Sequence, residues 1–304
     1  MRGVIVVIGE ALIDLLVRPD GRLEATVGGG PFNTARTIAR LGQRVAFAGR
    51  LSTDAFGRRL RDRLASDGVD LGLVVETDDP TTLAVVESST TGEAGYRFYL
   101  VGTSAPGLGM DALHAIQSPA ALHVGTLGLV LEPIGTTAEA VVGRMPAETF
   151  VMADLNARPA ATPDRAAWVA RIERLVGRVD MVKASVDDLL FFRPGHEPID
   201  TATTLVEAGP RVVLLTDGPR PVRIVTAEAT QIVEPPRVDV VDTVGAGDAL
   251  GGGFLAAWIG AGRGRADLVD TDALLDATSF AVRVASITCT RPGADPPTAS
   301  ELNQ

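Results

Sequence analysis

The chain has 304 residues, of which 28 are Lys or Arg and 38 are Asp or Glu, and its formal charge is −10. An acidic chain with few aromatic residues is poorly suited to coating nucleic acid, and its lone cysteine excludes an internal disulfide framework and a cysteine-built zinc site. The apolar run at the start is too short for a signal peptide, and no stretch reaches membrane-spanning length without charged, Gly or Pro residues. We therefore expect a cytoplasmic protein with no nucleic-acid or membrane partner.

The first hundred residues combine one buried strand with segments typical of a small β layer. Val4–Ile8 is continuously apolar and β-branched, which indicates a strand buried on both faces. Turn residues separate strand-like runs within 12–27 and again within 72–102, so we expect two hairpin-like insertions. The other elements predicted here are helices at 32–41 and 55–65 and a strand at 45–49.

From residue 120 onward, short apolar strands alternate with helical segments. The strands are predicted at 121–124, 149–153, 181–183 and 212–216, and the helices at 168–176, 249–259 and 273–287. Such alternation is typical of a parallel sheet that is covered by helices on both faces. No repeat or long linker divides the chain, so we expect a single domain over 1–304 into which 12–27 and 72–102 are inserted.

The most specific motif is the string D-T-V-G-A-G-D from Asp242 to Asp248, which leads directly into a predicted helix. Successive amide groups at Gly245, Ala246 and Gly247 can form an anion-binding concavity that the helix dipole reinforces. A carboxylate at Asp248 can then accept a proton from an attacking hydroxyl group during phosphoryl transfer. The alternative is a glycine-rich turn with Asp248 as N-cap, but the length of the string favours the catalytic interpretation.

A second glycine-rich string, G-G-G-P-F-N, runs from Gly28 to Asn33. Glycines let the backbone approach a polyhydroxylated ligand, and the Asn33 amide can both donate and accept hydrogen bonds. The carboxylate of Asp14 can accept two sugar hydroxyl groups. Alternatively, Asn33 caps the following helix and Asp14 is a solvated strand residue. The presence of both strings favours ligand binding.

Together, the two strings resemble the signatures of the ribokinase-like, or PfkB-type, carbohydrate kinases, and of their fructokinase-like branch in particular. The resemblance covers essentially the whole chain. It implies a ribokinase-like α/β fold, in which a central, mostly parallel sheet is flanked by helices and a small β-sheet lid, often shared in a homodimer, covers the sugar. It also implies that ATP and Mg²⁺ bind. The residue roles it implies are Asp248 as catalytic base, the amides of Gly245, Ala246 and Gly247 as charge-stabilising groups, and Asp14, Gly28, Gly29 and Asn33 as sugar-binding residues.

Two strings point to further contacts with the sugar or the transferred phosphoryl group. Arg158 ends the string D-L-N-A-R, which resembles a segment of fructokinase-like and ketodeoxygluconate-kinase-like members. Its planar, permanently charged fork suits a phosphate or a sugar acid, although a surface arginine in a Pro-rich loop is the alternative. Arg97 lies on the expected lid, where strand alternation puts it on the face opposite Tyr96 and Phe98. Arg97 is a candidate sugar contact, and lid packing is its alternative.

Three other strings match the family's nucleotide and ion sites in part. Ser185 and Asp188 stand where the family has N-x-x-E, which implies nucleotide binding and an Mg²⁺ contact through water, although charge at a helix start is the alternative. Thr216 and Gly218 resemble a nucleotide-binding T-x-G turn. Asp242 and the segment 290–294 resemble the surroundings of a monovalent cation, so activation by K⁺ stays open.

The resulting prediction is an ATP-dependent kinase that phosphorylates a free sugar. An unphosphorylated acceptor is expected, because phosphosugar-using relatives commonly carry a lysine in the glycine-rich region, and the one lysine of this chain is Lys183. Fructose leads, because Gly30-Pro31 before Phe32-Asn33 resembles fructokinase-like members. Ketodeoxygluconate, another free sugar and an adenosine-type nucleoside remain alternatives. A catalytically silent sugar- or nucleotide-binding protein is a further alternative, which the altered segment from Ser185 to Asp188 permits. An oxidoreductase is disfavoured, because no G-x-G-x-x-G follows the first strand.

Overall fold

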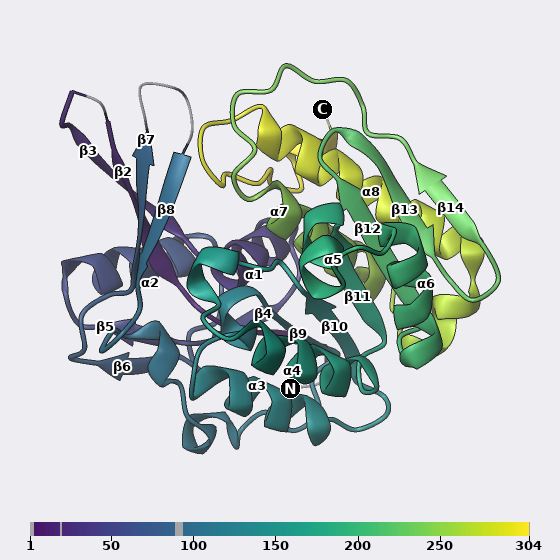
Figure 1. Cartoon of the computed structure of the whole chain (residues 1–304), viewed down its shortest axis with the longest axis horizontal. Helices are drawn as coiled ribbons and strands as arrows, with labels where there is room; N and C mark the ends of the chain where they lie inside the picture. The colour runs from purple at the N-terminus through teal and green to yellow at the C-terminus, as the bar shows by residue number, and fades with distance from the viewer. Residues whose placement is uncertain (1–2, 19, 89–93, 304) are drawn as a thin grey trace.

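The computed structural model describes residues 3–18, 20–88 and 94–303. They form three layers, with a central sheet between two layers of helices (Figure 1). The sheet strands are β1 (Ile5–Ile8), β4 (Val45–Ala48), β9 (Ala121–Gly125), β10 (Phe150–Asp154), β11 (Met181–Ser185), β12 (Val212–Asp217), β13 (Arg220–Val225) and β14 (Thr230–Val233). Within the described residues they form an eight-stranded sheet in the order β14-β13-β12-β11-β10-β9-β1-β4. The strands from β12 to β4 are parallel, and β13 and β14 are antiparallel. The expected mostly parallel sheet is confirmed.

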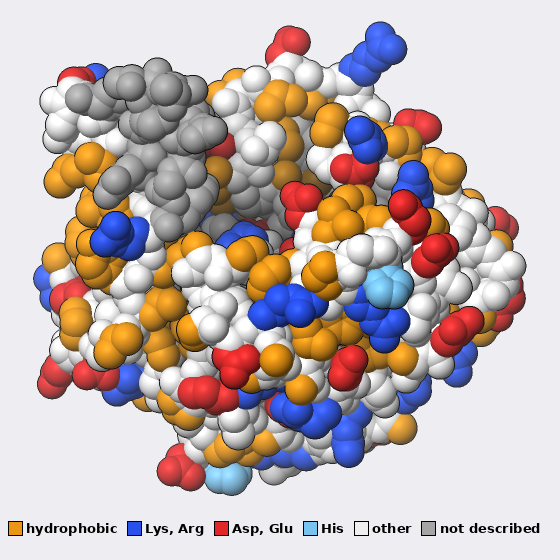
Figure 2. All heavy atoms as spheres, viewed as in Figure 1, with side chains coloured by type: hydrophobic (Ala, Val, Ile, Leu, Met, Phe, Trp, Pro, Cys, Tyr) orange, Lys and Arg blue, Asp and Glu red, His pale blue; other side chains and the backbone are white. Residues whose placement is uncertain are grey.

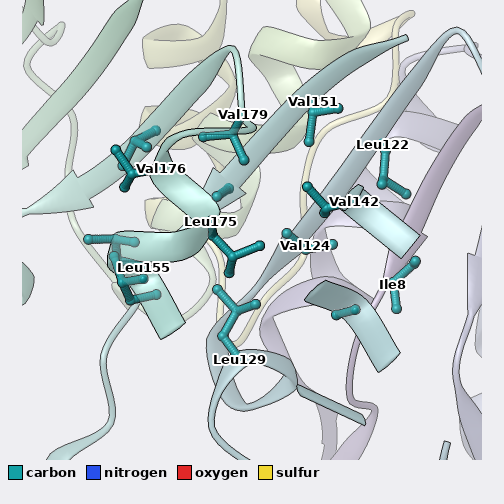
Figure 3. Close-up of a cluster of buried hydrophobic side chains, with 14 of the residues drawn as sticks. Ile8, Leu122, Val124, Leu129, Val142, Val151, Leu155, Leu175, Val176 and Val179 are labelled. Atoms are coloured by element: carbon teal, nitrogen blue, oxygen red, sulfur yellow. The ribbon is translucent and has the colours of Figure 1, made fainter. Parts of the chain in front are cut away.

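Helices cover both faces of this sheet. On one face lie α1 (Gly30–Arg40), α2 (Ala55–Ser66), α7 (Ala246–Gly260) and α8 (Thr271–Cys289), and on the other α3 (Ile134–Gly143), α4 (Arg165–Val176), α5 (Val186–Phe192) and α6 (Pro198–Ala208). Strand alternation divides the core accordingly, because Ile5 and Val7 of β1 face the first group and Val6 and Ile8 the second. Figure 3 shows part of the second cluster, where Val142 lies near Leu122 and Val124, and Leu175 lies near Leu129.

A smaller sheet stands beside the central one and projects from it in Figure 1. Its strands are β2 (Leu12–Val17), β3 (Leu23–Gly28), β7 (Leu83–Ser88) and β8 (Ala94–Tyr99), in the order β3-β2-β7-β8. The predicted β layer is therefore confirmed, although its tip at 90–93 lies outside the described residues. The second insertion contributes less than expected, because β6 (Val75–Thr77) pairs instead with β5 (Arg50–Ser52). We call β2, β3, β7 and β8 the lid sheet.

Several elements differ from the prediction. The pattern did not predict helices α3 and α6 or the antiparallel strands β13 and β14. Helix α1 begins at Gly30 with Gly29 as its N-cap, so the alternative in which Asn33 caps that helix is wrong. Among the described residues, no helix combines the length and apolar character that crossing a membrane requires.

The strand order predicts that ligands bind at the carboxyl ends of the central strands. After β1 the chain moves to β4 on one side, and later strands from β9 onward fill the other side, so the strand order reverses between β1 and β9. Ligands of open α/β sheets bind outside the carboxyl ends of the strands at such a switch point. Glu10, Thr126 and Asp154 lie at the ends of β1, β9 and β10, respectively, on this edge.

Candidate active site

Helix α7 begins at this edge, in the middle of the D-T-V-G-A-G-D string. Its N-cap is Gly245, whose φ of 78° favours glycine, and a methyl group there would lie 2.5 Å from Cβ of Ala294. The Ala246 amide donates to the Thr243 carbonyl at 3.2 Å. The other amides of the first turn have no intrahelical acceptor, because no helical turn precedes them. Asp248 is the third helical residue, so the alternative in which it is the N-cap is wrong.

Two asparagine side chains hold the Asp248 carboxylate. Asn33 Nδ2 donates to Oδ2 at 2.9 Å, and Asn156 Nδ2 donates to Oδ1 at 3.4 Å. Burial raises the pKa of Asp248 above its ordinary value, while the hydrogen bond from Asn33 and the charges of Lys183 and Arg158 act against that rise. The carboxylate is thus fixed in orientation beside the amides of α7, as a base for a hydroxyl group must be.

Asp14 shares this site from the lid sheet. A methyl group on Gly28 of the neighbouring strand would lie 2.0 Å from Asp14 Oδ2, so the missing side chain at Gly28 makes room for the carboxylate. Burial and the negative charge of Asp248 raise the pKa of Asp14 to about 6, while Arg158 lowers it. Asp14, Arg158 and Asp248 therefore act on one another electrostatically. Asp14 is half-buried rather than fully solvated, which favours the ligand-binding interpretation over the solvated strand residue.

Glu10 is a site residue that the sequence did not indicate. Its Oε1 accepts the Gly30 amide at 3.1 Å and its Oε2 accepts the Gly128 amide at 3.0 Å, so it joins the glycine-rich string to the turn after β9. Burial raises its pKa to about 8, even though these amides lower it and Asp248 raises it further. The sequence signal was the pair Gly9-Glu10 after an apolar strand, which belongs to the family resemblance but was given no role.

The segment after β10 brings Arg158 to the site, as the resemblance implied. Asn156, which binds Asp248, also donates to Thr126 Oγ1 at 3.1 Å. Arg158 is half-buried, and its Nη1 donates to the Ala157 carbonyl at 3.1 Å. The role of Asn156 was not predicted, although the D-L-N-A-R string contained it.

Asp188 and Ser185 close the start of α5 in a reciprocal capping box. The Ser185 hydroxyl accepts the Asp188 amide at 3.1 Å, and Asp188 Oδ2 accepts the Ser185 amide at 2.7 Å. Asp188 Oδ1 accepts the Ala157 amide at 2.7 Å. Both carboxylate oxygens are therefore engaged with backbone amides, and any metal contact from Asp188 would use the remaining lone pairs through water.

The remaining predicted nucleotide and ion residues lie farther along the same edge. Thr216 pairs with Ser185 across β11 and β12, and Gly218 has a φ of 54° in the turn that follows β12. Asp242 Oδ2 accepts the Gly293 amide at 2.9 Å, which brings the two parts of the expected cation site together. Among the described residues, no group of three or more His, Cys, Asp or Glu side chains is arranged to hold a metal ion.

Arg97 is the predicted sugar contact that the structure does not bring to this group. The lid register pairs Asp14 with Ala84 and Ala84 with Phe98, so these three residues share one face. Arg97 lies on the opposite face and is exposed. The prediction failed because alternation alone does not say which face is turned toward the site. The Tyr96 side chain lies outside the described part of the structure.

The space-filling view shows that the surface is hollowed between the lid sheet and the body of the molecule (Figure 2). Acidic and basic side chains are visible inside this hollow, whereas apolar side chains are common around it. A polyhydroxylated ligand with a charged phosphate suits such a lining better than an apolar ligand does.

Comparisons with known proteins agree with this geometry. Residues 3–301 match the family described as pfkB family carbohydrate kinase. A fructokinase of Rhizobium leguminosarum bv. trifolii is 35% identical over 260 residues, which are 82% of this chain and 77% of that protein. The structure of a Xylella fastidiosa fructokinase with bound ATP has a TM-score of 0.92 at 28% identity and covers 100% of this chain and 98% of its own. A Vibrio cholerae fructokinase double mutant with fructose, ADP and potassium ion has a TM-score of 0.87 at 26% identity, with 96% and 94% covered.

Proposed function

Because this chain belongs to the pfkB family of carbohydrate kinases and is an ATP-dependent sugar kinase, we propose that its acceptor is fructose. The main support is the Asp248 carboxylate, which two asparagines fix at the start of α7 beside the Asp14 carboxylate. The names of the relatives support fructose over other sugars.

The sugar-binding side of the site is rich in hydrogen-bonding groups. Asp14, which lies on the lid sheet, accepts hydrogen bonds from hydroxyl groups of the sugar. Asn33 Oδ1 is buried and has no hydrogen-bond partner within the described residues, so it is an acceptor available to a sugar hydroxyl group. Gly28 leaves the space that the Asp14 carboxylate occupies, and so lets this carboxylate lie at the site. Together these groups orient a primary hydroxyl group of the sugar toward Asp248.

In the proposed reaction Asp248 accepts the proton of the sugar hydroxyl group while its oxygen attacks the γ-phosphorus of ATP in line with the departing ADP oxygen. The new O–P bond forms as the bond to ADP breaks, and ADP leaves with the electron pair. The first-turn amides of α7 and the guanidinium of Arg158 stabilise the negative charge on the transferred group. Closure of the lid sheet over the sugar excludes water, which would otherwise compete as acceptor.

We propose that ATP occupies the edge formed by Ser185, Thr216 and Gly218. Mg²⁺ usually keeps several waters and binds through substrate phosphates with one or two carboxylates, so it does not need a cage of acidic side chains, and the described residues form none. Asp188 would contact Mg²⁺ through water. When bound, Mg²⁺ neutralises charge on the phosphates. Asp242 and the segment 290–294, which the hydrogen bond from the Gly293 amide brings together, would surround a K⁺ ion, and a potassium ion is present in the Vibrio cholerae fructokinase structure.

The test is ADP release from Mg²⁺·ATP with a panel of acceptors, namely fructose, glucose, ribose, ketodeoxygluconate, fructose phosphates and adenosine, with the product mass measured. We expect fructose to give the highest kcat/KM. The variant Asp248→Asn should lose about 10²–10⁴-fold in kcat while it still binds fructose. A higher kcat/KM for another acceptor would overturn fructose. Full activity of Asp248→Asn would overturn the proposed base, and saturable ligand binding without turnover would support the silent binding protein.

A further inference from the structure

A buried ion pair lies directly beneath the start of α7. Lys183 Nζ is 3.1 Å from Oδ1 and 2.9 Å from Oδ2 of Asp154, and the two residues are register partners on β11 and β10. Their side chains are 4% and 2% exposed. Burying two charges at this depth carries a desolvation penalty that their attraction barely offsets, and replacing such a pair by apolar side chains is often neutral or stabilising. Stability alone therefore does not account for it.

The ammonium group touches the turn that carries the anion-binding amides. A methyl group built on Gly247 would lie 2.8 Å from Lys183 Nζ, so the charge lies against the backbone of the first turn. A helix start already carries partial positive charge, and a cation placed there is unfavourable for the helix. The arrangement becomes favourable when an anion binds at the amides, because both positive sources then act on it.

The charged groups that act on Lys183 lie on β10, α5 and α7. Burial alone lowers the pKa of Lys183, but the carboxylates of Asp154, Asp188 and Asp248 raise it above its ordinary value, so the ammonium stays protonated. His123 of β9 is buried and its pKa falls to about 3, through burial and the charge of Lys183, so it adds no second cation. Around Asp248 the charged or titratable groups are Glu10, Asp14, Asp154, Arg158 and Lys183.

We propose that Lys183 is a positioning residue of the phosphoryl-transfer site, which acts through Asp248 and the first turn of α7 without touching the substrate. Its fixed positive charge keeps the Asp248 carboxylate ionised against burial, and it adds to the potential that holds the triphosphate. Asp154 anchors the ammonium group in this position. This inference rests on the proposed role of Asp248 as base.

The first test measures the NMR signals of the Lys183 side chain and does not require turnover. Because it is the one lysine of the chain, protein labelled with ¹⁵N,¹³C-lysine and carrying no lysine in a tag gives a single lysine side-chain signal by NMR. We expect the Nζ and Cε signals to move when the Mg²⁺ complex of the β,γ-imido analogue of ATP binds, and to stay in place when AMP binds. No movement with the analogue, or equal movement with AMP, would overturn the proposal.

The second test removes the pair as a unit, because Lys183→Met alone leaves a buried carboxylate without its partner. The double variant Lys183→Met with Asp154→Asn restores neutrality at similar volume. We expect its kcat to fall at least tenfold at neutral pH and the acid limb of its pH–kcat profile to move toward higher pH by one unit or more. Wild-type kcat and an unmoved limb would show a purely structural pair.

The matched control is Arg171→Met on α4, which removes a largely buried arginine from its ion pairs with the more exposed Glu132 and Glu139 on the other face of the sheet. It should lose stability in a thermal melt and keep the wild-type pH–kcat profile. A control profile that moves like that of the double variant would overturn the proposal. Asp248→Asn distinguishes failure of the proposed base from failure of the proposed role of Lys183. Full activity of this variant would refute the role of Asp248 as base, whereas the lysine signal would still show whether Lys183 responds to the bound triphosphate.

Discussion

Asn156 and Thr126 are joined by a hydrogen bond of 3.1 Å from Asn156 Nδ2 to Thr126 Oγ1, and each has a positive φ, 33° and 55° respectively. Within the described residues they are the two non-glycine residues in this region of backbone conformation. Such conformations cost about 1–3 kcal/mol each and gather at functional sites. Here the strain serves a purpose, since the same amide of Asn156 reaches Asp248.

Replacing Asn156 should separate activity from stability. In Asn156→Gly and Asn156→Ala, Asp248 loses one of its two side-chain donors, so we expect kcat to fall about tenfold in both, which corresponds to one hydrogen bond of about 1.4 kcal/mol. Glycine tolerates the positive φ and alanine does not, so Asn156→Gly should unfold with about 1 kcal/mol more free energy than Asn156→Ala. Chemical denaturation and steady-state kinetics check this. Equal stability of the two variants would show that the backbone is not strained there.

The parts of the site that could be predicted from sequence are those in which one short string forms the whole feature. The D-T-V-G-A-G-D string contains the turn, the helix start and the carboxylate, so Gly245 and Asp248 were assigned from local physical chemistry. The fold class followed from alternating strands and helices. Helices α3 and α6 were not predicted from the hydrophobic pattern, although the buried residues Ile134, Ala138 and Val141 of α3 recur at helical spacing.

What could not be predicted depends on contacts between distant segments. Glu10 accepts an amide 118 residues away, at Gly128, and no local pattern encodes that contact. Lys183 was noted as the one lysine, but only the register of β10 and β11 places Asp154 beside it. Arg97 was assigned to the site because it lies on a lid strand that the sequence predicted. The pairing of Asp14 with Ala84, and of Ala84 with Phe98, then places Arg97 on the face opposite Asp14.

Sugar affinity should depend on pH through Asp14, whose pKa is about 6. The ionised carboxylate accepts two hydroxyl groups, and protonation removes acceptor capacity. The affinity for fructose should therefore be constant above pH 7 and fall by up to tenfold per pH unit below pH 6. Calorimetry without ATP, from pH 5 to 8, measures it.

The sign of this effect can be checked with Asp248→Asn. The negative charge of Asp248 raises the pKa of Asp14, so its removal should lower that pKa and move the loss of affinity to lower pH. In Asp14→Asn the affinity should be weak, and its remaining pH dependence should lack the step assigned to Asp14. A step that persists in Asp14→Asn, or one that moves to higher pH in Asp248→Asn, would assign it to another group.

Arg36 should be a strong determinant of stability. Its side chain is 1% exposed, and it contacts Asp67 through Nε at 2.6 Å and the Ala294 carbonyl through Nη1 at 2.8 Å. Arg36→Met leaves the buried Asp67 with only its longer contact to Arg40, so we expect a loss of about 3 kcal/mol in the free energy of unfolding. Urea denaturation measures it. The control Arg18→Met breaks an exposed pair with Glu24 and should leave stability nearly unchanged. Equal effects of the two substitutions would contradict this account.

Gly28 should determine sugar affinity through the space it leaves for Asp14. In Gly28→Ala the added methyl group would lie 2.0 Å from Asp14 Oδ2, so either the carboxylate or the strand must move. We expect the KM for fructose to rise at least tenfold, while kcat at saturating fructose changes less, because Asp248 and its two asparagines lie on other elements. The control Gly264→Ala adds a methyl group in open space and should keep both constants. An unchanged KM in a folded Gly28→Ala variant would place the sugar away from Asp14. A fall in kcat alone would instead show that the strand displacement reaches the base.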